Sequence, residues 1–86
     1  MTPEQCRMAR AALDWSIQHL ADKAEVGRNT ITRYERGGDA RVSSVNTIRR
    51  TLEVAGIRFI ERDRNGGPGV RLVDPELDFG ALPSID

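Results

Sequence analysis

Residues 28–36, Arg-Asn-Thr-Ile-Thr-Arg-Tyr-Glu-Arg, place strong hydrogen-bonding side chains at helical spacing. If this stretch is a helix, Arg28, Asn29, Thr32 and Arg33 share its exposed face, because residues three and four apart are neighbours on a helix. The Arg guanidinium can donate two parallel hydrogen bonds to a guanine edge, and the Asn amide can pair with adenine. These four residues are therefore candidates for contacting bases in the major groove of DNA.

Two short helices joined by a tight turn are expected over residues 16–37. Ser16 can cap the first helix, Gly27 is expected to begin the second, and Gly37 is expected to end it. In both helices, apolar residues recur at intervals of three or four, which predicts a buried stripe on each. The stripe residues are Leu20, Ala21 and Ala24 in the first helix and Ile31 and Tyr34 in the second.

The pattern Leu-Ala-x4-Val-Gly-x3-Ile-x2-Tyr-Glu-Arg-Gly, which begins at Leu20, resembles the lambda-repressor-like (Cro/Xre-type) helix-turn-helix transcriptional regulators. The resemblance covers residues 3–56 and implies a mainly α fold with five helices. Two positions depart from the family pattern. Glu25 stands where the turn usually has Gly, and Ile17 stands where Gln or Glu is common.

The resemblance also implies contacts to the DNA backbone from the first helix and from the start of the last helix. For Arg10, an ion pair with a carboxylate such as Glu35 is an equal alternative. Ser43 or Ser44 is expected to cap the last helix, which should run to about residue 55. The expected phosphate-contacting residues are Arg10, Ser16, Thr30, Arg41, Ser44 and Asn46.

The start of the chain also predicts a helix. Thr2 as N-cap, Pro3 at the first helical position and Gln5 reaching back form a favourable start. The residues then expected to face the core are Cys6, Ala9 and Leu13.

The net charge of the chain is zero, but the charge is unevenly distributed. Residues 74–86 hold four carboxylates and no Lys or Arg, so residues 1–73 carry +4. Between residues 28 and 50, six arginines stand against Glu35 and Asp39. Attraction to phosphate depends on the charge of the local surface more than on the whole-chain sum, so this distribution is compatible with a nucleic-acid partner.

Length and composition exclude several other classes. A chain of 86 residues makes one small domain, and nothing in it approaches the 18 consecutive apolar residues of a membrane span. The start lacks the features of a signal peptide, so a cytoplasmic, nucleoid-associated protein of a bacterium or phage is expected. One Cys and one His predict neither a disulfide within the chain nor a metal site, and no cofactor or enzyme motif is present.

After residue 56 the apolar period changes from helical to alternating, which predicts a β-hairpin over residues 57–73. Its two strands flank a Gly-rich loop. One face is expected to hold Ile57, Phe59, Val70 and Leu72. The hairpin can pack on the chain's own helices or pair edge to edge with a second copy, and a homodimer would contact two DNA half-sites.

The sequence thus predicts three parts: a helix-turn-helix DNA-binding domain (1–56), a β-hairpin that is a candidate dimerisation element (57–73) and an acidic tail (74–86). The tail is expected either to fray or to dock on a second protein. The predicted function is sequence-specific binding of double-stranded DNA by a small transcriptional regulator. Two alternatives stay open: an antitoxin whose tail covers a toxin, and a protein-interaction module that has lost DNA binding.

Overall fold

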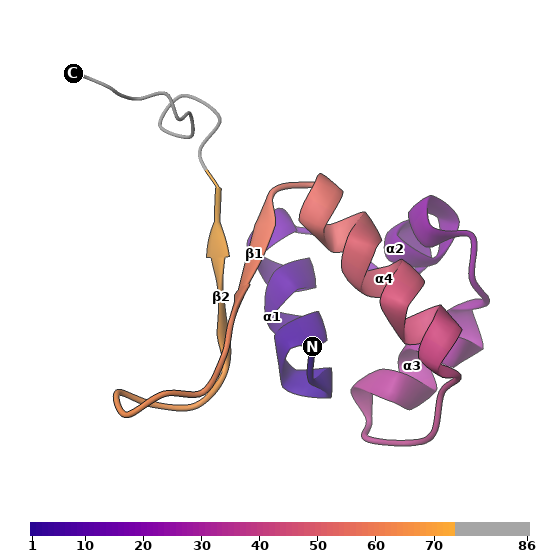
Figure 1. Cartoon of the computed structure of the whole chain (residues 1–86). Coiled ribbons are helices and arrows are strands. Elements are labelled where there is room, and N and C mark those ends of the chain that lie inside the picture. The colour runs from indigo at the N-terminus through magenta and orange to yellow at the C-terminus, as the bar shows by residue number, and fades with distance from the viewer. Residues whose placement is uncertain (74–86) are drawn as a thin grey trace.

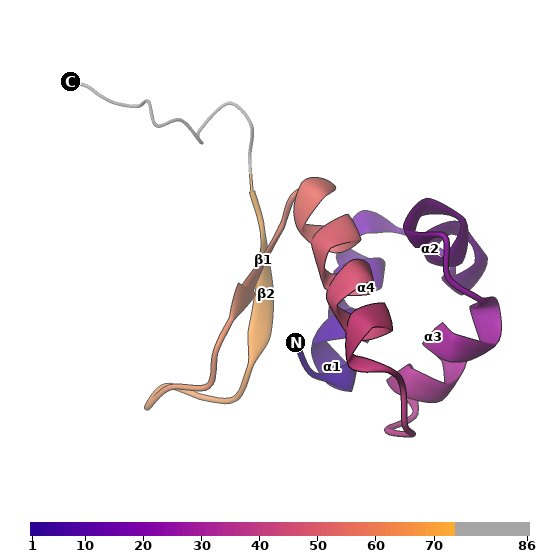
Figure 2. The ribbon, with the colours of Figure 1, turned by 45° about the vertical axis from the view of Figure 1, so that its right-hand side comes forward.

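The computed structural model describes residues 1–73 as four helices followed by a two-stranded antiparallel sheet (Figure 1). The helices pack together, and the hairpin lies against α1 and α4 (Figure 2). Among these residues, no helix is both long and apolar enough to cross a membrane. The elements are α1 (Pro3–Leu13), α2 (Ile17–Ala24), α3 (Arg28–Glu35), α4 (Val42–Val54), β1 (Ile57–Ile60) and β2 (Gly69–Leu72).

The first two helices begin as the sequence predicts. The Thr2 hydroxyl accepts a hydrogen bond from the Gln5 N–H, and the Gln5 side chain accepts one from the Thr2 N–H. Pro3 occupies the first helical position. The Ser16 hydroxyl accepts from the N–H of His19 at the start of α2. Both starts therefore satisfy backbone groups that a helix leaves without intrahelical partners.

All four helices and β1 contribute to one hydrophobic core. The apolar stripes predicted for α2 and α3 are confirmed, because every stripe residue is buried. Trp15 is half-buried and packs against the edge of the core. The buried core residues are Cys6, Ala9, Leu20, Ala21, Ala24, Ile31, Tyr34, Ile48, Leu52 and Ile57.

The predicted hairpin forms, and its register is given by the pairing of the two strands. Ile57 pairs with Leu72, and Phe59 pairs with Val70. This register puts the four apolar residues on one face of the sheet, since side chains alternate along a strand. Ile57 lies in the core, while Phe59 and Val70 are half-buried against it. The hairpin therefore packs on its own helices, which is one of the two arrangements that the sequence allowed.

A buried side chain of α1 fastens the hairpin to the helices. The Gln5 amide is 1% exposed, and its Nε2 donates to the carbonyls of Ile60 and Gly69, each at 2.9 Å. These two residues belong to different strands and face each other in the sheet. On α4, the guanidinium of Arg49 lies 5.4 Å from the centre of the Phe59 ring, a cation–π contact. Both strands are thus joined to the helical body.

The prediction of five helices is wrong: residues 3–56 form four. Gly37 follows α3 with φ 88°, and Gly56 follows α4 with φ 110°. These left-handed conformations end a helix at both positions, and the segment between them forms one continuous helix, α4, after a connection at residues 38–41. Beyond Gly56, the alternating apolar pattern forms the hairpin, so no fifth helix is made in the described residues.

The predicted cap of the last helix is also wrong. The N-cap of α4 is Arg41, and no side chain caps this end. The carbonyl of Arg41 accepts from the N–H of Val45, so the first turn begins before either serine. Ser43 and Ser44 therefore lie inside the first turn.

Residues 74–86 lie outside the described part of the chain. The predictions that fall on them, the acidic tail as a docking segment for a second protein and the antitoxin alternative, are not addressed by the described residues.

The turn between α2 and α3 stores backbone strain at Glu25. This residue ends α2 with φ 57° and ψ 41°, a left-handed conformation in which Cβ lies too close to the following carbonyl oxygen. The family pattern that the sequence resembles usually has Gly here, which adopts this conformation without the clash.

We expect Glu25→Gly to raise the free energy of unfolding by about 0.5–1 kcal/mol, because relief of the left-handed strain outweighs the extra chain entropy of Gly. Urea unfolding monitored by circular dichroism measures the change. Lys23→Gly is the matched control: this exposed position has ordinary helical geometry, so the substitution should cost about 1 kcal/mol. Equal losses for the two variants would show that Glu25 is not strained.

Candidate nucleic-acid interface

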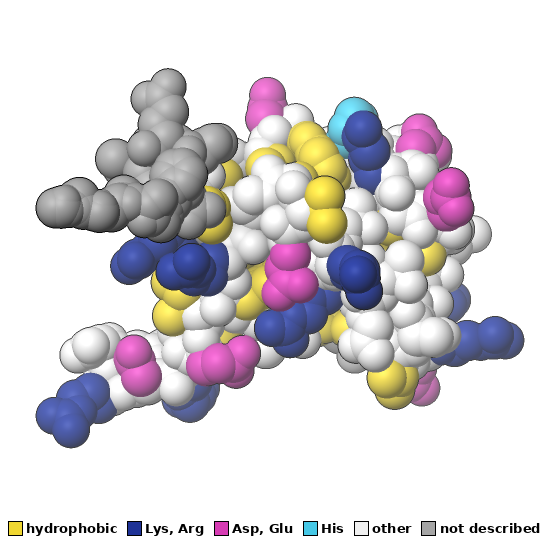
Figure 3. Space-filling view, turned by 45° about the horizontal axis from the view of Figure 1, so that its top comes forward, with side chains coloured by type: hydrophobic (Ala, Val, Ile, Leu, Met, Phe, Trp, Pro, Cys, Tyr) yellow, Lys and Arg dark blue, Asp and Glu magenta, His cyan; other side chains and the backbone are white. Residues whose placement is uncertain are grey.

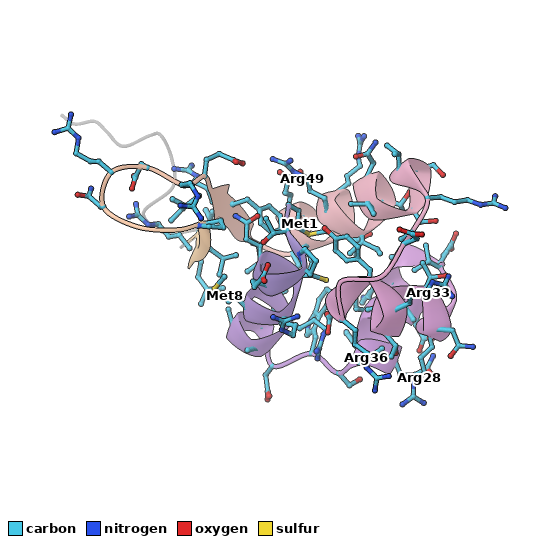
Figure 4. All side chains as sticks on the ribbon, turned by 90° about the horizontal axis from the view of Figure 1, so that it is seen from below. Met1, Met8, Arg28, Arg33, Arg36 and Arg49 are labelled. Atoms are coloured by element: carbon cyan, nitrogen blue, oxygen red, sulfur yellow. The ribbon has the colours of Figure 1, made fainter. Side chains whose placement is uncertain are left out.

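The leading end of α3 presents polar groups to the outside. Its N-cap is Gly27, so the first backbone N–H groups of the helix have no side-chain cap. Arg28 and Asn29 follow immediately and are exposed, and Arg28 points away from the body of the protein (Figure 4). Thr32 is half-buried one turn later. An Arg, an Asn and uncapped N–H groups therefore share one end of a helix, a combination that suits phosphate and base edges.

The opposite face of α3 fixes the helix to the core. Ile31 is fully buried, and Tyr34 is 8% exposed. The Tyr34 hydroxyl donates to the carbonyl of Met1 at 2.8 Å. Burial raises the pKa of Tyr34 above its ordinary value, so the phenol remains a protonated donor at neutral pH.

The last residue of α3, Glu35, carries a buried carboxylate that binds α1. Arg10 donates to its two oxygens from Nε and Nη2, each at 2.7 Å. Arg10 also donates from Nη1 to the carbonyl of Trp15, so every nitrogen of its guanidinium has a partner. Arg7 donates to the Glu35 main-chain carbonyl. The ion pair offered as an alternative for Arg10 is confirmed, and a phosphate contact by Arg10 stays a prediction.

Cys6 completes the set of groups around Glu35. Its Sγ lies 3.2 Å from Oε2 of the carboxylate. Burial, together with this hydrogen bond, raises the pKa of Cys6 well above its ordinary value, so the side chain is a neutral thiol that donates. The hydrogen bond to Glu35 likewise raises the pKa of Arg10. Among residues 1–73, no group of three His, Cys, Asp or Glu side chains is arranged to hold a metal.

Arg33 is held differently from Arg28. Its Nε donates to the carbonyl of Asp39 at 2.9 Å, in the turn that follows α3. A Cβ on Gly38 would lie 2.7 Å from Cγ of Arg33, so the glycine leaves the space in which this side chain lies. Arg33 is exposed, and the bond from its Nε to Asp39 restrains the position of its side chain.

Arg36 is a candidate that was missing from the predicted base-contacting residues. It is exposed and continues the line of Arg28 and Thr32 at four-residue spacing. Figure 4 shows Arg28 and Arg36 on the same side of the molecule. Thr32 and Arg36 also line a groove that Ile17 of α2 borders. The four-residue spacing was the signal in the sequence that could have identified Arg36.

The predicted phosphate-contacting residues lie at several helix starts. Ser16 is exposed and uses its oxygen for the cap, but its hydroxyl can still donate. Thr30 is half-buried in the first turn of α3. Arg41 and Asn46 are exposed at the start of α4, and Ser44 is half-buried between them. Because no side chain caps α4, its first N–H groups are available to an anion.

The hairpin residues predicted for dimerisation divide into two groups. Ile57 is 2% exposed in the core of its own chain, and Phe59 and Val70 are half-buried. Leu72, at 54% exposed, is the member of the set that the chain itself covers least. A partner subunit would therefore meet Leu72 and the strand edges.

Two helices meet at a tight turn, and the second is apolar on its inner side and basic on its outer side; together they define a helix-turn-helix DNA-binding domain. The chain belongs to the helix-turn-helix family, because the model of that family matches residues 7–61, more than half of its length. Membership supports DNA binding and transcription regulation as the general function. No curated protein matches the chain at a significant level.

We expect Glu35→Gln to lower the free energy of unfolding by about 3 kcal/mol, because it leaves the largely buried Arg10 guanidinium without its counter-charge. Urea unfolding measures the loss. The double variant Arg10→Met/Glu35→Met should lose less than Glu35→Met alone, since no unpaired charge remains.

The chain provides a matched control in its second ion pair, Arg49 with Glu53 at 3.2 Å, where both side chains are more than 40% exposed. Glu53→Gln should change stability by less than about 1 kcal/mol. If Glu35→Gln costs no more than Glu53→Gln, the buried pair does not hold α3 in place.

Proposed function

We propose that this protein is a small transcriptional regulator that binds double-stranded DNA sequence-specifically, with α3 in the major groove. The observation that carries the proposal is the division of α3 into two faces. Its inner face is buried through Ile31, Tyr34 and Glu35, and its outer face exposes Arg28, Asn29 and further basic residues.

The leading residues of α3 are the best placed for base contacts. Arg28 and Asn29 are both exposed and neither side chain has a protein partner among the described hydrogen bonds, so a guanine and an adenine edge are suitable partners. Arg33 reaches the DNA from the far end of the helix while bonded to Asp39. Thr32 contributes a hydroxyl. We add Arg36 to this set because it lies on the same exposed line.

Backbone contacts would come from helix starts on either side of α3. The uncapped N-terminus of α4, with Arg41, Ser44 and Asn46, supplies N–H groups, cationic charge and side-chain donors. Ser16 and Thr30 add hydroxyls. Such contacts fix the register of a protein on the duplex without selecting a sequence.

We propose that the regulator acts as a homodimer, because a helix of this length contacts only a few base pairs. With DNA as its partner, we propose that it acts in the cytoplasm, at the nucleoid. The hairpin is the element for pairing: Leu72 is exposed, and each strand has one edge without a partner strand in the described chain. Pairing of two such edges would place two copies of α3 in adjacent half-sites.

Selection from a random duplex pool at about 0.15 M salt tests this function directly. The wild-type protein should enrich a palindrome whose half-sites lie about one helical turn apart. Arg28→Ala should cost about 1–3 kcal/mol on that site and relax the preference at one base pair. Arg64→Ala, which removes an exposed arginine from the hairpin loop, is the matched control and should leave the motif unchanged.

Failure of the folded wild-type protein to enrich any sequence would overturn sequence-specific binding and favour the protein-interaction alternative. An equal loss for Arg28→Ala on all sequences would instead assign Arg28 to phosphate.

Arg41→Ala should weaken binding to every duplex by a similar factor. Because Arg41 is expected to neutralise one phosphate, the slope of log affinity against log salt should fall in magnitude by about one. Titrations by fluorescence anisotropy at several salt concentrations measure the slope. An unchanged slope would remove Arg41 from the phosphate contacts.

A further inference from the structure

A groove on the helical body is not used by the proposed DNA interface. It lies between the end of α1, α2 and the last turns of α4, with a volume of about 600 Å³. Leu13, Trp15, Val54 and Ala55 give it an apolar lining, and Lys23 and Arg50 add two cations. No residue of α3 lines it. We refer to these six residues as the α4 groove.

The α4 groove leaves apolar surface uncovered in the described part of the chain. Val54 is 82% exposed, the highest value among the exposed large hydrophobic residues described. Figure 3 shows hydrophobic side chains gathered on this side of the molecule, with Lys and Arg side chains near them. Apolar surface bordered by charge is typical of a site where another segment docks.

The described chain ends beside this groove. The N–H of Val73 donates to the carbonyl of Gly56 at 2.7 Å. Gly56 directly follows Ala55, which lines the groove. Residues 74–86 therefore continue from a point next to the end of α4, and an extended chain advances roughly 3.3 Å per residue, so they can reach every part of the groove.

We propose that residues 74–86 of the same chain dock in the α4 groove. Their sequence begins Asp-Pro-Glu-Leu-Asp-Phe, in which carboxylates alternate with apolar residues. In an extended segment, such alternation puts Leu77 and Phe79 on one side and the carboxylates on the other. The apolar side matches the apolar lining of the groove. The carboxylates then face away from that lining, and the long, exposed side chains of Lys23 and Arg50 can pair with them there.

The covalent attachment of residues 74–86 at Val73 favours docking on the same chain over docking on a second copy. A segment attached next to its site has an effective concentration far above that of a separate molecule in dilute solution. Docking also holds four carboxylates on a surface to which α3 contributes nothing, where they do not repel the phosphates of a bound duplex.

The chain contains one tryptophan, Trp15, and it lines the groove, so its fluorescence reports on the occupant. We measure emission and acrylamide quenching of the full chain at one fixed pH, because the His19 ring lies 4.7 Å from the indole. The tail variant Leu77→Ser/Phe79→Ser should shift the emission to the red and increase quenching, because docking buries the indole.

The groove side is tested with two exposed valines of α4. Val54→Asp should produce the same red shift, since its carboxylate repels the acidic segment. When it is combined with the tail variant, it should cause no further red shift, because the tail is already undocked. Val42→Asp is the matched control: this valine is 75% exposed at the other end of α4 and should leave the emission unchanged. Neither valine is in the core, so both variants should fold.

Three results would overturn the proposal. One is unchanged emission and quenching in the tail variant, and another is a red shift from Val42→Asp equal to that from Val54→Asp. The third is a change in emission on dilution that coincides with the dissociation of a dimer, as measured by sedimentation velocity. That result would assign the groove to a second copy. None of these results depends on DNA, so they are independent of the proposed function.

Discussion

The carboxylate of Glu35 is the constraint on which the rest of the structure depends. It is buried at the end of α3 and accepts hydrogen bonds from Arg10 and Cys6 of α1. A buried charge is tolerated only where hydrogen-bond donors surround it. Since these donors are on α1, they restrict the position of α3 relative to α1. The hydrogen bond to this carboxylate is the main cause of the raised pKa of Arg10, and it adds to the effect of burial in raising the pKa of Cys6.

This constraint matters because α3 is short. Eight residues are too few to form a stable helix alone in water, so tertiary contacts must provide the stability of α3. Those contacts are the apolar residues of its inner face and the polar groups of α1. The side chains of the outer face therefore need not stabilise the fold, which leaves them available for the DNA contacts that we propose.

Features with a local cause could be predicted from the sequence. Short-range spacing predicts the capping box at Thr2, the buried stripes and the apolar face that the two strands share, and the structure has all three. The helix count and the start of α4 could not be predicted, because they depend on how glycine turns and tertiary packing divide the chain. The bond from Arg33 to Asp39 also depends on the path of a turn that no periodicity specifies.

The side chain of Gln5 has a wider consequence. Because it bonds to Ile60 and Gly69, the two strands cannot slide relative to α1, and the contacts of Glu35 in turn fix α1 to α3. In a two-fold dimer built on the hairpin, the separation of the two copies of α3 would be a rigid property of the fold. One extra base pair moves a half-site by about 3.4 Å and rotates it by about a tenth of a turn. Such a dimer would discriminate between operators by the length of their spacer as well as by their bases.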